Sequence, residues 1–382
     1  MRGLIGDLQS NPKRYWTFLK TLKGKYSAIP HLFDGDRKVT TDTDKAELLN
    51  RAFGRKFSKP RVSLPPTPPD YPLDVLSEFA ISEETVRNIL LSISPYKACG
   101  PDGISARVIR ECYEQLAVPV TIICRLSLEQ GTVPRSWKRA NIIPIFKKGS
   151  KYDPANYRSV SLLPLFSKVL ERVVYVSLFS HVNPVLRSEQ HGFMPRRSCM
   201  TNLATMLHEA WNNISDGMQT DVIYTDFSAA FQSVDHSLLL HKLRCSFKVS
   251  DRAFLWLKSY FTDREQRVVI NGKCSTWMSV PSGTPEGSLL SPLLFLCYIN
   301  DLPDSVKTNC LMFADDVKLY HRVTSHTDCA FLQKQLDELC HWSRQWGLAL
   351  NPTKCKILTI SLRRQPVTFV YTIAGATLEK SQ

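Results

Sequence analysis

The sequence predicts a mixed α+β fold, and two kinds of pattern lead to this expectation. Short apolar stretches that end in or are broken by acids, such as residues 221–227 and 310–320, have the composition of strands. Longer stretches with apolar residues at helical spacing, such as 82–95 and 329–345, predict helices. With 382 residues, of which 43% are hydrophobic, the chain can bury a sizeable core in two or three domains.

The charge balance indicates a polyanionic partner. Lys and Arg number 49 against 35 Asp and Glu, which gives a formal net charge of +14. Nucleic acid is the first class of partner to expect and an anionic membrane surface the second. No apolar stretch of signal-peptide length precedes Lys13, and the most apolar run, residues 289–299, contains Pro292 and is about half the length of a spanning helix. We therefore expect a buried core element there and no membrane partner.

The 11 cysteines are scattered, odd in number and without a C-x-x-C pair. This pattern favours reduced thiols in an intracellular protein over a disulfide framework or a zinc site.

Residues 1–59 are predicted to form a basic N-terminal extension. Its lysines and arginines alternate with aromatic residues, among them Tyr15, Trp16 and Phe18. Such a mixture suits phosphate contact combined with base stacking. An amphipathic helix that packs Trp16 and Leu19 on a neighbour explains the pattern equally well.

A proline-rich linker, residues 60–72, marks the clearest boundary, because six prolines prevent any regular element there. A helical region is expected over residues 73–127. Its first helix begins after the capping residue Ser82 and ends by residue 95, and a second apolar helical stretch covers residues 106–129.

Residues 140–146 predict a strand, followed by a basic turn that contains Lys147 and Lys148. Arg158 would reach the same space if the segment that contains it pairs with this strand. Lysines at the tip of a hairpin are also typical of plain solvated turns.

Asp315 and Asp316 lie between two apolar runs, which predicts a hairpin with carboxylates at its turn. A solvated acidic turn is the ordinary explanation. A divalent-metal site is the alternative, because hard cations bind carboxylate oxygens and cancel the repulsion between the two acids. Asp226, which follows a predicted strand, could be a helix cap or a third carboxylate of a two-metal site for in-line phosphoryl displacement.

Further motifs follow in a fixed order along the chain. The ordered set consists of Gly100-Pro101-Asp102-Gly103-Ile104, residues 143–149, Asn156-Tyr157-Arg158, Gln190-His191-Gly192-Phe193, residues 225–231, Ser282 to Ser288, Phe313-Ala314-Asp315-Asp316, and residues 347–355. This set resembles the reverse transcriptase of non-LTR (LINE-type) retrotransposons from about residue 75 to residue 360.

The resemblance implies a right-hand polymerase, with a palm made of an antiparallel sheet backed by helices and with fingers that close over the nucleotide. Residues 128–382 would form the fingers and palm. The thumb would be largely missing, as in a truncated element.

The resemblance also assigns the acids. Asp226, Asp315 and Asp316 match the residues that hold two Mg²⁺ ions, or Mn²⁺ in their place, and the backbone carbonyl of Phe227 matches an additional metal ligand. In such a site one ion activates the primer 3′-hydroxyl and the other neutralises the leaving pyrophosphate.

Other residues match the nucleotide pocket. Phe231 matches the bulky residue that rejects a 2′-hydroxyl, and Lys354 matches a general acid for pyrophosphate, although it could equally be a solvated lysine. The nucleotide-binding set implied by the resemblance is Arg158, Lys147, Lys148, Phe227, Phe231, Glu286 and Gly287.

Four positions in or next to the matched motifs depart from the family pattern. Glu286 stands in place of a usual Gln, Ser159 in place of Pro, Met194 in place of Arg or Lys, and Gln232 in place of Asp. A carboxylate at position 286 would repel a triphosphate unless it is hydrogen-bonded or protonated.

The expected function is an RNA-directed DNA polymerase that acts on an RNA template, a DNA primer and deoxynucleoside triphosphates. Phe231 disfavours an RNA-dependent RNA polymerase. A catalytically impaired remnant that only binds RNA is the alternative from a different class, and a scaffold protein is a third. The expected location is the nucleus and cytoplasm, as a ribonucleoprotein.

Overall fold

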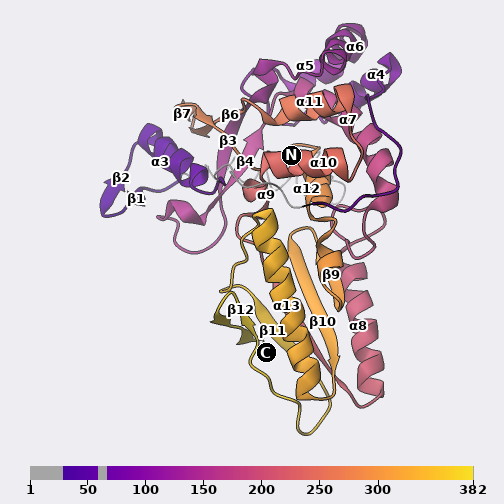
Figure 1. Cartoon of the computed structure of the whole chain (residues 1–382). Coiled ribbons are helices and arrows are strands. Elements are labelled where there is room, and N and C mark those ends of the chain that lie inside the picture. Colours follow the sequence, from indigo (N-terminus) through magenta and orange to yellow (C-terminus); the bar gives the residue numbers. More distant parts are fainter. Residues whose placement is uncertain (1–28, 59–66, 382) are drawn as a thin grey trace, which may run out of the picture.

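The computed structural model describes residues 29–58 and 67–381 (Figure 1). The aromatic and basic stretch around Trp16 and most of the proline-rich linker lie outside the described residues. The helices are α3 (Asp42–Gly54), α4 (Glu83–Ser92), α5 (Ala106–Glu111), α6 (Tyr113–Glu129), α7 (Leu165–Val182), α8 (Cys199–Ser215), α9 (Ala230–Ser233), α10 (His236–Cys245), α11 (Asp251–Phe261), α12 (Ser291–Ile299) and α13 (His326–Trp346).

The strands are β1 (Leu32–Asp34), β2 (Arg37–Val39), β3 (Arg139–Phe146), β4 (Tyr157–Leu162), β5 (Gln219–Thr225), β6 (Glu265–Ile270), β7 (Lys273–Cys274), β8 (Met278–Ser279), β9 (Asn309–Phe313), β10 (Asp316–Val323), β11 (Lys356–Ile360), β12 (Thr372–Ile373), β13 (Ala376–Thr377) and β14 (Glu379–Lys380). This mixture confirms the α+β class.

Five strands form the acid-bearing sheet, in the order β14-β11-β5-β10-β9. Neighbouring strands are antiparallel except β11 and β14. The register pairs Thr225 with Val317 and Phe313 with Asp316, so β5 ends beside the turn between β9 and β10. Residues that follow β5 therefore meet that turn at one end of the sheet.

The acid-bearing sheet is covered on both faces, because successive side chains of a strand point to opposite sides. Val222 joins a small buried cluster with Met206 of α8. The next residue, Ile223, joins the main core together with Leu336 of α13. In Figure 1, α13 and α8 flank the long β10 strand.

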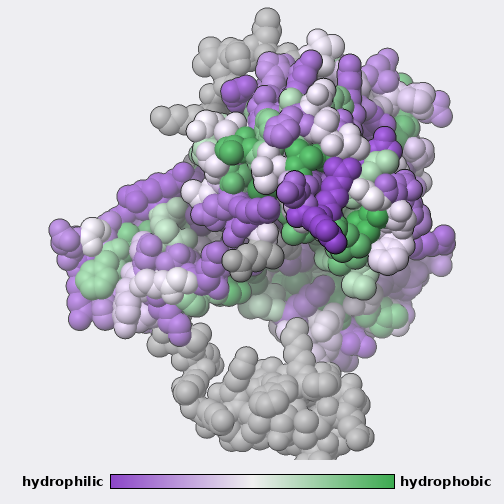
Figure 2. All heavy atoms as spheres, turned by 90° about the horizontal axis from the view of Figure 1, so that it is seen from below, coloured by the Kyte–Doolittle hydropathy of each residue, from purple (hydrophilic) through white to green (hydrophobic). Residues whose placement is uncertain are grey.

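The second sheet, called here the β3 sheet, has the order β4-β3-β6-β7, with β8 also paired to β6. Helix α3 packs against β6 and β7, and its Leu49 and Phe53 share a buried cluster with Ile142 and Val268. Residues 29–58 therefore belong to the same packed unit as the β3 sheet. Seen from below, this unit projects to the left, and hydrophilic residues cover most of its visible surface (Figure 2).

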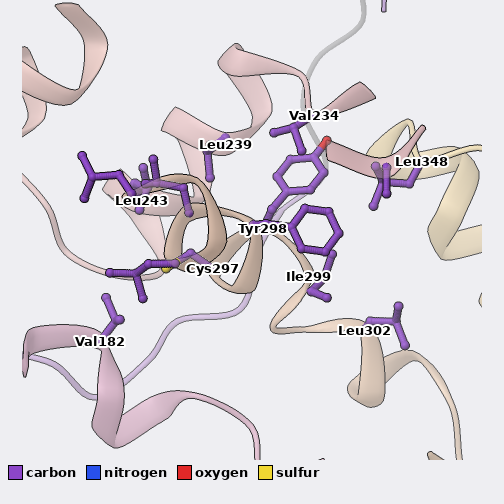
Figure 3. Close-up of a cluster of buried hydrophobic side chains, with 14 of the residues drawn as sticks. Val182, Val234, Leu239, Leu243, Cys297, Tyr298, Ile299, Leu302 and Leu348 are labelled. Atoms are coloured by element: carbon purple, nitrogen blue, oxygen red, sulfur yellow. The ribbon is translucent and has the colours of Figure 1, made fainter. Parts of the chain in front are cut away.

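Helix α12 lies at the centre of the main core, and all of its residues from Leu293 to Ile299 are buried. Figure 3 shows Leu239 and Leu243 of α10 on one side of α12, near Tyr298 and Cys297. A helix that is apolar all round must be buried, which confirms the core element predicted at this position. No helix within the described ranges has the length and apolar composition needed to span a membrane.

The predicted helical stretch over residues 106–129 is two helices, because the chain breaks at Cys112 between α5 and α6. The predicted cap is confirmed, since Ser82 accepts a hydrogen bond from the Thr85 N–H at the start of α4.

Candidate functional site

Most of the residues singled out from the sequence surround one cavity of about 700 Å³. Both sheets contribute to its walls. Its predicted lining residues are Lys147, Arg158, Asp226, Phe227, Phe231, Glu286, Gly287, Asp315, Asp316 and Lys354. Lys148 does not line the cavity, although its charge acts on Lys147. The structure thus brings together residues that lie far apart in the sequence.

The acidic turn is a tight hairpin, as predicted. The pairing of Phe313 with Asp316 leaves only Ala314 and Asp315 in the turn. Ala314 has a φ of 55°, in the left-handed region that costs a residue with a side chain about 1 kcal/mol or more. Because the turn is strained, it needs support from its surroundings.

That support comes from the segment that contains Gln190. The Gln190 Oε1 atom accepts hydrogen bonds from the backbone N–H groups of Gly192, at 2.7 Å, and Ala314, at 2.9 Å. The His191 N–H also donates to the carbonyl of Met312 at 2.9 Å. The motif around Gln190, for which no role was predicted, therefore braces the acidic turn.

Glycine is the only residue type that fits at position 192, since a Cβ on Gly192 would lie 2.3 Å from the backbone nitrogen of Ala314. We expect Gly192→Ala to lower the free energy of unfolding by about 3 kcal/mol, because the backbone of the turn would have to move. Gly217→Ala is the matched control: no atom lies within 4 Å of the added Cβ, and only the positive φ adds about 1 kcal/mol of strain. Urea unfolding measures both, and equal losses would contradict the role of Gly192.

Asp226 follows the end of β5 and faces the acidic turn. Its carboxylate oxygen Oδ2 accepts a hydrogen bond from the ammonium of Lys354 at 2.6 Å. Its backbone carbonyl accepts from the N–H of Asn351 at 2.8 Å, so the segment before β11 is tied to the end of β5. This pairing places Lys354 in the cavity, as the sequence predicts.

The carboxyls of the turn are in an environment that disfavours negative charge. Burial raises the pKa of Asp315, and the charge of Asp226 raises it further. Partial burial also raises the pKa of Asp316, followed by the charges of Asp315 and Asp226. The three acids therefore repel one another, and a bound cation would relieve this repulsion.

Within residues 29–58 and 67–381, no group of three or more His, Cys, Asp or Glu side chains is close enough to share a metal ion. The donor types still suit a hard cation, since three carboxylates line one cavity. Lys354 holds Asp226 Oδ2, and a cation that uses this oxygen would have to displace the lysine. The Phe227 carbonyl is not engaged by the neighbouring pairing with the 349–351 segment, which uses the Asp226 carbonyl and the Ser228 N–H.

Basic side chains of the hairpin formed by β3 and β4 also line the cavity. The strands β3 and β4 pair as a hairpin, which brings Arg158 to the same side as Lys147, as expected. Burial lowers the pKa of Lys147, and the positive charge of Arg158 lowers it further. Two cations that repel each other beside a cavity form a receptor for an anion.

Phe231 lies five residues after Asp226 in the sequence and also lines the cavity. Its ring stacks on Phe295 of the buried helix α12 at a centroid distance of 4.3 Å, and meets the edge of Phe193 at 6.2 Å. The ring is therefore fixed by packing from behind and from one side. A rigid aromatic wall of this kind selects ligands by shape.

Glu286 is hydrogen-bonded by two of the residues that depart from the family pattern. Gln232 Nε2 donates to one carboxylate oxygen, and Ser159 Oγ donates to the other at 3.3 Å. Burial raises the pKa of Glu286, which the hydrogen bond from Ser159 opposes. The repulsion expected from this carboxylate is thus moderated by neighbours that the sequence showed only as separate departures.

The loop that contains Glu286 runs along β4. The Ser161 N–H donates to the Glu286 carbonyl at 2.9 Å. At Gly287, φ is 102° and an added Cβ would lie 2.7 Å from the Ser161 carbonyl oxygen. A glycine is therefore required where this loop approaches the backbone of β4.

Lys56 and Phe193 also line the cavity and were not predicted to do so. Phe193 lies in a motif that we quoted without a role. Lys56 lies in a segment that the sequence placed in a separate extension, and no local pattern distinguishes it from the other basic residues there.

Comparison with known proteins shows which family this chain matches. The model of the family described as "Reverse transcriptase (RNA-dependent DNA polymerase)" matches residues 145–373. The RNA-directed DNA polymerase from the mobile element jockey of Drosophila melanogaster is 28% identical over 296 residues, which cover 74% of this chain and 32% of that protein. The probable RNA-directed DNA polymerase from transposon X-element of the same fly is 28% identical over 311 residues, 79% of this chain and 34% of that protein.

A third relative has similar coverage. The probable RNA-directed DNA polymerase from transposon BS of Drosophila melanogaster is 28% identical over 316 residues, which cover 78% of this chain and 34% of that protein. The chain thus spans about a third of the length of the curated relatives that it matches.

Proposed function

This chain belongs to the reverse transcriptase family, and from this premise we propose that it is an RNA-directed DNA polymerase of a non-LTR retrotransposon. The reaction is the addition of deoxynucleotides to a primer 3′ end along an RNA template. The observation that carries the proposal is that Asp226, Asp315 and Asp316 line the same cavity as Lys147 and Arg158. Polynucleotide synthesis needs both kinds of group, because cations must hold the triphosphate while carboxylates serve the metal site.

In the proposed architecture, the acid-bearing sheet with α8 and α13 is the palm, and the β3 sheet belongs to the fingers. The net charge of +14 suits the RNA template and the DNA primer as partners. We further propose that the protein acts as a ribonucleoprotein in the nucleus and the cytoplasm.

Asp226, Asp315, Asp316 and the carbonyl of Phe227 would hold two Mg²⁺ ions, for which Mn²⁺ could substitute. When bound, these ions supply a more acidic primer 3′-hydroxyl and neutralise charge on the leaving group. The brace from Gln190 to Ala314 keeps the acids of the turn in position for this role.

The remaining cavity residues act on the nucleotide. Arg158 and Lys147 bind the phosphates, since a guanidinium can contact two oxygens at once. Lys354, once released from Asp226, donates a proton to the leaving pyrophosphate. Phe231 closes the space next to the sugar C2′ position and so favours deoxynucleotides.

Primer extension on poly(A) with an oligo(dT) primer tests the proposal. Purified protein should extend the primer with dTTP in the presence of Mg²⁺ and not after chelation, and Asp315→Asn should not extend it. If the unmutated chain binds RNA but does not extend the primer, the polymerase proposal is overturned and the RNA-binding alternative is left.

Phe231→Ala should weaken discrimination between deoxy- and ribonucleotides. We expect the ratio of kcat/KM for dTTP to that for UTP to fall by about 100-fold, because removal of the ring opens space for a 2′-hydroxyl. The value of kcat/KM for dTTP itself should change much less. An unchanged ratio would show that another residue selects the sugar.

A further inference from the structure

Lys56 is the feature that neither the family match nor the sequence assigns to the site. It follows α3 and precedes residue 145, where the family match begins. Nevertheless it lines the same cavity as Arg158 and Lys147.

The backbone around Lys56 is anchored on both sides. Before it, α3 is attached to the strand region of the β3 sheet, since Asn50 Nδ2 donates to the carbonyl of Thr276 at 3.0 Å. After it, the Ser58 N–H donates to Ser282 Oγ and the Ser58 hydroxyl donates to the carbonyl of Ser233, each at 2.8 Å. Tertiary contacts on both sides therefore determine the position of Lys56.

The ammonium of Lys56 is half-buried at the cavity wall. It donates a hydrogen bond to the Tyr157 carbonyl at 3.3 Å and lies 5.4 Å from the ring centroid of Phe53. The Tyr157 carbonyl immediately precedes Arg158, so both cations act on one end of the cavity. An ammonium has three N–H donors, and one hydrogen bond to a carbonyl does not saturate it.

The acid that acts on Lys56 already has other partners. Burial lowers the pKa of Lys56, while the charge of Glu286 raises it. Both oxygens of Glu286 accept hydrogen bonds, from Gln232 and from Ser159. The positive charge of Lys56 therefore remains available to an anion that enters the cavity.

We propose that Lys56 binds a phosphate of the incoming nucleotide together with Lys147 and Arg158, so that residues 29–58 form part of the nucleotide site. This inference rests on the proposed function, because it names a further ligand of the same substrate. It also gives Glu286 a role, since the negative charge of this carboxylate favours the charged form of Lys56.

The test uses dTTP as the probe in two assays with the full chain. In primer extension, Lys56→Met should raise KM for dTTP about tenfold with a smaller change in kcat, because one charged hydrogen bond is lost. Lys56→Arg keeps the charge and should restore KM to within about threefold. Lys38→Met is the matched control, since Lys38 is an exposed lysine of the same segment and does not line the cavity.

The second assay measures binding of dTTP with Mg²⁺ directly, by isothermal titration, and does not depend on catalysis. Here Lys56→Met should weaken binding by a similar factor, with a melting temperature like that of Lys38→Met. If the unmutated chain binds dTTP in this Lys56-dependent way but extends no primer, the polymerase proposal fails and the role of Lys56 stands. Equal dTTP affinity in Lys56→Met and the unmutated chain would overturn the inference.

Discussion

Asp226→Asn is expected to abolish primer extension while the fold is kept. The substitution removes one of three carboxylates that line the cavity at the end of the acid-bearing sheet, and with it an oxygen that the proposed metal site needs. We expect kcat to fall by at least about 10³-fold, which corresponds to about 4 kcal/mol of transition-state stabilisation. Single-turnover extension with saturating dTTP measures this loss.

Unlike kcat, the thermal stability of the folded chain should not fall in Asp226→Asn. The charge of Asp226 raises the pKa of both Asp315 and Asp316, so its removal relieves repulsion between the folded chain's acids. The melting temperature of Asp226→Asn should therefore equal or exceed that of the unmutated chain. Asp216→Asn, at the exposed end of α8, is the matched control for activity and should leave kcat unchanged. More than a tenth of the activity in Asp226→Asn would contradict the assignment.

A variant of Lys354 separates the contribution of this lysine to activity from that of Asp226, its ion-pair partner. Lys354→Met leaves the Asp226 carboxylate in place but removes its partner at 2.6 Å. If the lysine serves as a proton donor for the leaving group, kcat for extension should fall by about 10²-fold. A loss well below this range would indicate that Lys354 only orients Asp226.

The sequence predicted the hairpin and its acids correctly because both are local features. The apolar residues on each side of Asp315 and Asp316 mark two strands, and the two acids fall at the turn between them. The same holds for the strand before Asp226. Local pattern is sufficient where an element is long enough to show its period and is bounded by an unlike residue.

Contacts between distant segments could not be predicted in this way. The packing of α3 on β6 and β7 brings Lys56 to the cavity, and it depends on apolar residues that look the same as any others in the sequence. Likewise, Ser159, Gln232 and Glu286 appeared as three unrelated departures, yet they form one hydrogen-bonded group. Such side-chain pairing is decided by tertiary structure and has no period.

A buried ion pair next to α12 is expected to be the most sensitive point for stability. The ammonium of Lys242 in α10 donates to the carbonyl of Tyr298 at 2.6 Å and to the carboxylate of Asp301 at 2.5 Å. The rings of Trp342 and Trp346 lie over the same ammonium, at 5.3 and 3.4 Å from its nitrogen. Lys242→Met should lower the free energy of unfolding by about 3–5 kcal/mol, because it leaves Asp301 buried without its counter-charge.

The double variant Lys242→Met with Asp301→Asn should lose less than the sum of the two single variants, since neither charge is left unpaired. Guanidinium unfolding measures all three, and additive losses would contradict the coupling.

Burial lowers the pKa of Lys242 from 10.5 to about 8, while Asp301 opposes this shift. Between these pH values the folded chain binds fewer protons at Lys242 than the unfolded chain, so its contribution to stability rises with pH across that window. This rise should disappear in Lys242→Met, which ties the pH dependence to one ammonium.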